Sequence, residues 1–190
     1  MRRRLKLFWL NHLHFLTRFW YALTGRLTWI KGPVVDYYAS PEQIAHVFMS
    51  YNSYKLDPWG GKLDYMKHPR RVQKRLDSAT PKPVGDCDDH GAYWCAALAK
   101  ASLSREIYLG IYRAVDSAGE EYGHAVCVFK RGGTWFYADY GLPTPIETKW
   151  GFIEKDADLR GAAPIGGFLI RVRGVSRGDT LRFGRSEGRG

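Results

Sequence analysis

The chain has one strongly apolar helical segment, which limits the folds that are open to the protein. Residues 87–102 place apolar side chains at helical spacing, and those expected to be largely buried are Tyr93, Trp94, Ala97, Leu98 and Ala101. Pro81, Pro83 and Gly85 come just before this segment and predict its start. We therefore expect a buried central helix that other elements cover.

This helix begins with an unusual group of polar residues, Gly85-Asp86-Cys87-Asp88-Asp89. The N-terminus of a helix carries partial positive charge, which favours a thiolate and lowers the pKa of a thiol. Because the thiolate is the reactive form of cysteine, the position predicts that Cys87 is a nucleophile. The alternative is an inert buried thiol, since free cysteines are commonly buried.

The second half of the chain has the pattern of strands separated by turns. The expected strands are 105–114, 124–130, 134–139 and 165–172, and the clearest turns are 116–119 and 131–133. Earlier, Ser40-Pro41 with Gln43 predicts a helix start. Antiparallel strands that follow helices indicate an α+β domain.

A histidine and an aspartate follow the cysteine in the order of a thiol catalytic triad. His124 begins one expected strand and Asp139 ends the next, so the two side chains can meet across a hairpin. His124 is the candidate general base for Cys87, and Asp139 would orient its imidazole. The rival bases are His68 and His90, and the alternative for Asp139 is a turn residue.

These residues resemble the transglutaminase-like superfamily, and most closely the bacterial transglutaminase-like cysteine proteinases. The signature at the nucleophile is matched by residues 85–89, the His-Ala-Val strand by His124-Ala125-Val126, and the later aspartate by Asp139. Upstream, residues 64–69 look like that family's Asp-Tyr-(aromatic)-x-x-Pro segment. The resemblance covers residues 40–145 and implies a papain-like, transglutaminase-type domain whose central helix packs on an antiparallel sheet.

The resemblance implies a thiol hydrolase that cleaves a peptide or amide bond through an acyl-enzyme on Cys87. The backbone N–H of Cys87 is a natural oxyanion donor, and the second donor would come from the irregular segment 52–84. The candidates for that second donor are Trp59, Tyr65 and Asn52. Two alternatives stay open: a cross-linking transferase, and a non-catalytic binding or structural module, virion- or secretion-associated, that keeps the fold.

The carboxylates beside the cysteine have two interpretations. Acids in the first turn of a helix are favourable because they complement its dipole, so Asp86, Asp88 and Asp89 would cap the helix. Some members of the resembled family depend on calcium through such carboxylates, which makes Asp86 and Asp88 candidate calcium ligands. We favour capping and expect no required cofactor.

The net charge of +10 is concentrated at the two ends of the chain. Residues 1–32 contain seven Lys or Arg and no acid, and residues 169–190 contain six Arg and two acids, which leaves the middle close to neutral. We therefore divide the chain into a basic N-terminal segment (1–32), a cysteine hydrolase domain (33–173) and a basic, disordered tail (174–190). Nucleic acid is a disfavoured partner, and the expected partner is a protein or peptide substrate.

Residues 5–23 read as an amphipathic helix rich in aromatic side chains. It could pack on the body, lie on a membrane surface, dock on a protein partner or act as a signal anchor.

Three cysteines form no disulfide framework, and we expect Cys95 and Cys127 to be small buried side chains. The odd cysteine count agrees with a reducing compartment, and a cytoplasmic or membrane-peripheral location is favoured.

Overall fold

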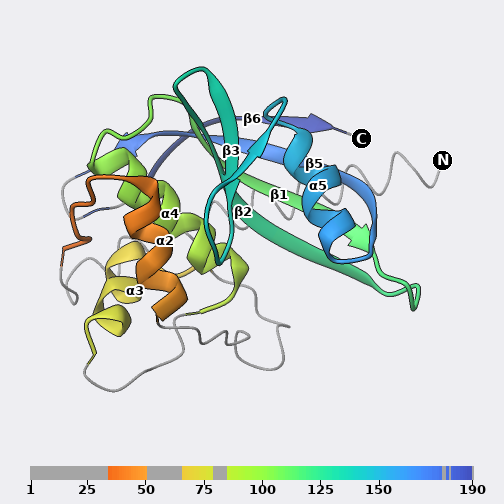
Figure 1. The fold of residues 1–190 in the computed structure, drawn as a ribbon, viewed down its shortest axis with the longest axis horizontal. Helices are drawn as coiled ribbons and strands as arrows, with labels where there is room; N and C mark the ends of the chain where they lie inside the picture. Colours follow the sequence, from red (N-terminus) through yellow and green to blue (C-terminus); the bar gives the residue numbers. More distant parts are fainter. Residues whose placement is uncertain (1–33, 51–65, 79–84, 177–178, 180, 190) are drawn as a thin grey trace.

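A computed structural model describes residues 34–50, 66–78, 85–176, 179 and 181–189. This part of the chain contains four helices and one six-stranded antiparallel sheet (Figure 1). The helices are α2 (Pro41–Ser50), α3 (Pro69–Leu76), α4 (Cys87–Lys100) and α5 (Gly151–Leu159). The strands are β1 (Ile107–Val115), β2 (Glu121–Arg131), β3 (Thr134–Ala138), β4 (Thr144–Ile146), β5 (Ala163–Val175) and β6 (Leu181–Arg189). Helices α4 and α5 pack on the sheet, and α2 and α3 pack on α4. The expected α+β class is confirmed.

The sheet has the strand order β4-β3-β2-β1-β5-β6, and every neighbouring pair is antiparallel. One face packs on α4, and the other face packs on α5. Since both faces are covered, residues 124–129 of β2 are buried without interruption. This strand therefore lies between the two helices whose residues form the candidate site.

Helix α4 is the buried central helix that its apolar pattern predicts. Its side chains from Ala92 to Leu98 are fully buried between the sheet and the helices α2 and α3. Gly91 allows close approach, because a Cβ at this position would lie 2.9 Å from the Leu109 side chain and 3.4 Å from the Val126 carbonyl carbon. The first turns of α4 are thereby pressed against β2.

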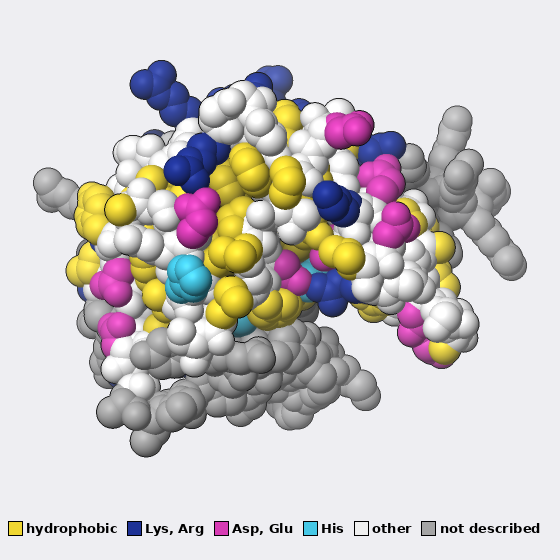
Figure 2. All heavy atoms as spheres, viewed as in Figure 1, with side chains coloured by type: hydrophobic (Ala, Val, Ile, Leu, Met, Phe, Trp, Pro, Cys, Tyr) yellow, Lys and Arg dark blue, Asp and Glu magenta, His cyan; other side chains and the backbone are white. Residues whose placement is uncertain are grey.

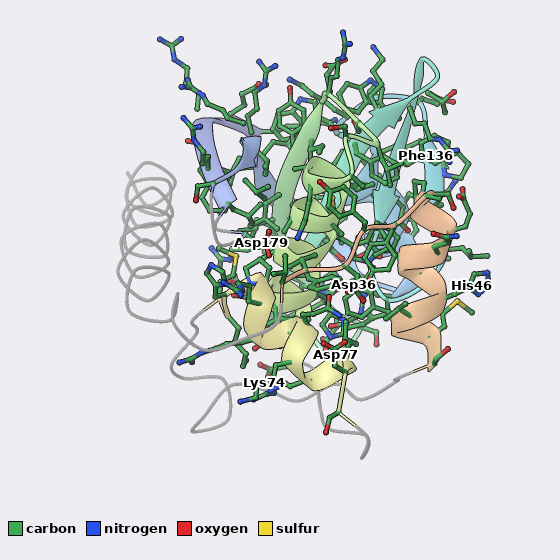
Figure 3. All side chains as sticks on the ribbon, turned by 90° about the vertical axis from the view of Figure 1, so that its left-hand side faces the viewer. Asp36, His46, Lys74, Asp77, Phe136 and Asp179 are labelled. Carbon is green, nitrogen blue, oxygen red and sulfur yellow. The ribbon has the colours of Figure 1, made fainter. Side chains whose placement is uncertain are left out.

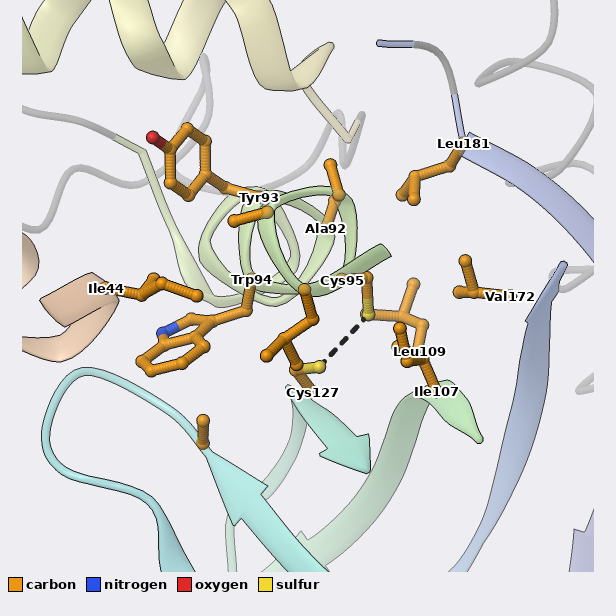
Figure 4. Close-up of a cluster of buried hydrophobic side chains, with 14 of the residues drawn as sticks. Ile44, Ala92, Tyr93, Trp94, Cys95, Ile107, Leu109, Cys127, Val172 and Leu181 are labelled. Carbon is orange, nitrogen blue, oxygen red and sulfur yellow. Dashed lines mark hydrogen bonds between the residues drawn. The ribbon is translucent and has the colours of Figure 1, made fainter. Parts of the chain in front are cut away.

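Cys95 and Cys127 lie in this contact, and both are fully buried, as expected. Their Sγ atoms form a thiol–thiol hydrogen bond of 3.3 Å between α4 and β2 (Figure 4).

Three elements were not expected from the sequence: β4, α5 and β6. Strand β4 has only three residues, and α5 buries just Phe152, Ile153, Asp156 and Ala157. Such short apolar patterns carry little periodic signal, and tertiary packing on β1 and β5 stabilises α5 instead. Helix α3 lies in the long segment 52–84, where short helices were one expectation.

The expected disorder of residues 174–190 is wrong for the residues described. Strand β6 pairs with β5, and Leu181 and Phe183 contribute to the core that faces α4. Asp179 accepts a hydrogen bond of 2.8 Å from the Val35 N–H and forms an ion pair with Lys100 (Figure 3). Glycine and arginine dominate the composition here, so it resembles a disordered tail although Leu181 is buried and Phe183 is partly buried.

The expected helix at residues 5–23 lies outside the described residues. None of the described helices is long and apolar enough to span a membrane. On the face drawn in Figure 2, acidic, basic and apolar side chains are interspersed, as expected for a nearly neutral body. 

We expect Asp179→Ala to lower the free energy of unfolding by about 1–3 kcal/mol, because the Val35 N–H and the Lys100 ammonium lose a buried acceptor. Chemical denaturation measures the change. Glu187→Ala is the control, since its carboxylate makes only a half-exposed ion pair with Lys149 and should change stability by less than about 1 kcal/mol. Unchanged stability in Asp179→Ala would support the original expectation that residues 174–190 are disordered.

Candidate active site

Cys87 is the first residue of α4, and a network centred on Asp89 fixes this start. The Asp86 N–H donates to Asp89 Oδ2 at 3.3 Å, and Lys67 bonds the same carboxylate through its backbone N–H and its ammonium group. A side chain at Gly85 would overlap the Asp89 carboxylate, which explains the glycine of the motif. Asp86 is the N-cap residue and forms a capping box with Asp89, and Asp88 Oδ1 accepts from the Asp89 N–H at 2.9 Å, so the expected capping by the acids is present.

The electrostatics around Cys87 differ from the expectation. Burial and the Asp88 carboxylate raise the pKa of the half-buried Cys87 thiol well above its ordinary value, and Asp86 and Asp139 act in the same direction. A hydrogen bond from the Ala125 N–H opposes this shift. The predicted lowering of the pKa by the helix N-terminus was wrong, because carboxylates surround the thiol at this helix end. The thiol is protonated at neutral pH.

The Ala125 hydrogen bond places Cys87 against β2 next to His124. The His124 side chain is buried, and its Nε2 lies 3.1 Å from Oδ2 of Asp139, which directly follows β3. The structure thus brings the expected base and its orienting acid together across the β2–β3 hairpin, and it sets Cys87 beside the same strand.

Three further residues meet His124, and the sequence did not single them out. Asp156 Oδ2 lies 3.7 Å from His124 Nε2 and accepts hydrogen bonds from the Tyr112 hydroxyl (2.5 Å) and Arg160 Nε (3.0 Å). A terminal nitrogen of Arg160 lies 2.6 Å from Asp139 Oδ2 and 2.9 Å from His124 Nε2. Neighbouring carboxylates raise the pKa of Arg160 further above its ordinary value although burial opposes this, so the guanidinium stays charged.

One sequence signal could have identified this pair. Asp156 and Arg160 are four residues apart, and Asp156 lies on the same helical face as the apolar Phe152 and Ile153. An acid on the buried face of a helix needs a partner, which marks the position as unusual.

The rival histidines occupy other roles. His68 caps α3, with its Nδ1 accepting from the Arg70 N–H at 3.2 Å, and burial lowers its pKa to about 4. His90 is buried between the rings of Phe48 and Tyr140, at centroid distances of 4.7 and 4.5 Å, and burial lowers its pKa to about 4. Among the described residues, neither ring nitrogen of His90 has a hydrogen-bond partner.

The second oxyanion donor cannot be placed from the three candidates, because Asn52, Trp59 and Tyr65 all lie outside the described residues. The Cys87 N–H opens α4, where backbone donors lack helical partners.

Two groups of side chains have ligand atoms close enough to share a cation. The oxygens of Asp86, Asp88 and Asp89 lie within 4.8 Å of one another, as do the ligand atoms of His124, Asp139 and Asp156. Each group already contacts a side-chain cation: Lys67 pairs with Asp89, and Arg160 pairs with both Asp139 and Asp156. A calcium ion at the first group would compete with Lys67 for Asp89.

We expect the burial of His90 to make stability depend on pH. An unfolded histidine with a pKa of 6.5 takes up a proton before the folded one, with a pKa of about 4, so the stabilisation is complete above 6.5 and is lost as pH falls towards 4. His90→Phe keeps the ring and removes the titration. Between pH 7 and pH 5, wild type should lose about 2 kcal/mol more than this variant in chemical denaturation. Equal losses would contradict a neutral buried His90.

No protein-family model, curated protein or solved structure matches this chain. The site is therefore interpreted from its own geometry and from the motif resemblance.

Proposed function

We propose that the protein is a thiol hydrolase that cleaves a peptide or amide bond through Cys87, His124 and Asp139. The observation that carries the proposal is the convergence at β2, where the Ala125 N–H bonds the Cys87 thiol and Nε2 of the adjacent His124 lies 3.1 Å from Asp139 Oδ2. A cysteine at a helix start, a buried imidazole and a carboxylate behind it have the arrangement of a thiol triad.

The raised pKa of Cys87 makes the base essential to this mechanism. His124 would take the thiol proton as sulfur attacks the carbonyl carbon, and it would return that proton to the leaving amine. The sulfur then carries the acyl group until water, activated by His124, hydrolyses the thioester. Asp139 would hold the imidazole and stabilise its protonated form.

The resemblance and the α+β architecture together support a transglutaminase-type, papain-like domain. The central α4 on an antiparallel sheet agrees with that assignment. We propose a protein or peptide substrate, with residues 5–23 attaching the enzyme to a membrane surface or protein partner. Catalysis through Cys87 would need no cofactor; the acids beside it cap α4, and Asp86 and Asp88 are the candidate ligands for calcium.

A non-catalytic binding module is the second candidate, and one observation favours it. The Cys87 thiol is held protonated by burial and by neighbouring carboxylates, which is the state of an unreactive cysteine. The two proposals differ in whether Cys87 can be acylated.

For the hydrolase, we expect a thiol-directed acylating probe to label wild type at Cys87 and to leave Cys87→Ala unlabelled. Cys95→Ala and Cys127→Ala are matched controls that should still label, because both of these thiols are fully buried. Intact-protein mass spectrometry measures the modification. Equal labelling of wild type and Cys87→Ala would exclude Cys87 as the nucleophile, and an unlabelled wild type would favour the binding module.

We expect His124→Ala to slow the acylation of Cys87 by about 10²- to 10⁴-fold, the range of general base catalysis. Asp139→Asn should slow it less, because Asp139 orients the base without accepting the proton. Stopped-flow labelling rates, with circular dichroism to verify folding, make the comparison. If His90→Ala abolishes acylation and His124→Ala does not, the base is wrongly assigned.

A further inference from the structure

Arg160 contacts the nitrogen of His124 that a thiol triad reserves for its carboxylate. Its terminal nitrogen lies 2.9 Å from His124 Nε2 and 2.6 Å from Asp139 Oδ2, and its Nε bonds Asp156 at 3.0 Å. The guanidinium therefore contacts the base and both acids, and the base also lies 3.1 Å from Asp139 Oδ2.

The chemistry of the guanidinium fixes the direction of this hydrogen bond. Arginine has five N–H donors, no acceptor, and no neutral form in proteins. Nε2 of His124 can take part in a hydrogen bond with Arg160 only as the acceptor, through its lone pair. A neutral imidazole carries one proton, so in this arrangement the proton is on Nδ1.

This tautomer cannot accept the Cys87 proton at Nδ1. Nε2 is occupied by Arg160 and Asp139, so Nδ1 is the nitrogen left to receive the thiol proton. An Nδ1 that already carries a proton has no lone pair for that transfer. The productive tautomer has its proton on Nε2, where it is donated to Asp139.

We propose that Arg160 is a positioning residue that holds His124 in the tautomer with its proton on Nδ1, which cannot accept the thiol proton. We call this contact the latch, and the structure is then the resting state of the site. This regulatory role rests on the proposed hydrolase function. Activation is the release of Nε2 by Arg160, after which the imidazole proton moves to Nε2 and Asp139 accepts it.

The Arg160 side chain has access to solvent when it releases His124. Arg160 directly follows α5, its side chain is 36 % exposed, and Gly161 behind it has a φ of +64°. Its Nε bonds Asp156, and its terminal nitrogen contacts His124. Because the guanidinium is planar and rigid, release of His124 requires the whole group to move towards solvent.

The direct test is the tautomer of His124, read from ¹⁵N chemical shifts of the full chain labelled at histidine. The His124 signals are assigned by their loss in His124→Ala. We expect wild type to carry the proton on Nδ1 and Arg160→Gln to carry it on Nε2. Lys155→Gln is the control, because it removes a positive charge from the same helix, where Lys155 bonds the Pro145 carbonyl, and it should match wild type. A wild type with the proton on Nε2 overturns the latch without any variant, and so does an unchanged tautomer in a folded Arg160→Gln.

The labelling rate of Cys87 gives the second measurement. Release of the latch should make Arg160→Gln label several-fold faster than wild type, with Lys155→Gln unchanged. Slower labelling of Arg160→Gln would show that Arg160 supports the base, and it would overturn the latch. If no variant labels at all, the hydrolase proposal fails, and the tautomer measurement still decides whether Arg160 sets the state of His124.

Discussion

The close packing of α4 on β2 is the contact on which the rest of the structure depends. It brings the first turn of the helix to the strand that carries His124, and Gly91 makes the approach possible. The same contact buries the thiols of Cys95 and Cys127 and removes one face of β2 from water, while α5 lies on the other face of the sheet. Core packing and the geometry of the site are therefore set by one interface.

That interface also concentrates charge. Carboxylates at the start of α4, after β3 and on α5 lie close together in a partly buried region. Repulsion between like charges is unfavourable there. Two cations offset them: Lys67 pairs with Asp89 at the helix start, and Arg160 pairs with Asp139 and Asp156 beyond His124. Each cation belongs to a segment distant in sequence from one of its acids, so the charge balance exists only in the folded chain.

The sequence predicted the elements whose signals are local. The start of α4, the strands β1 to β3 and the pairing of His124 with Asp139 follow from spacing, turns and alternation along the chain. Strand β6 was missed because its composition resembles disorder, and α5 because three apolar side chains give too short a pattern. The pKa of Cys87 was mispredicted because the helix dipole was given more weight than burial, the largest cause, which depends on tertiary structure. The flanking Asp88 and Asp86 also raise this pKa, and they are visible in the sequence.

The raised pKa of Cys87 makes the tautomer of the His124 imidazole important. If the helix dipole had held Cys87 as a thiolate, the tautomer of His124 would matter little to the attack on a carbonyl. Because burial and Asp88 keep the thiol protonated, the proposed attack would need a nitrogen with a free lone pair, and in our proposal the contact between Arg160 and Nε2 determines which nitrogen has it. Arg160, which directly follows the unexpected helix α5, would then control the reactivity of Cys87.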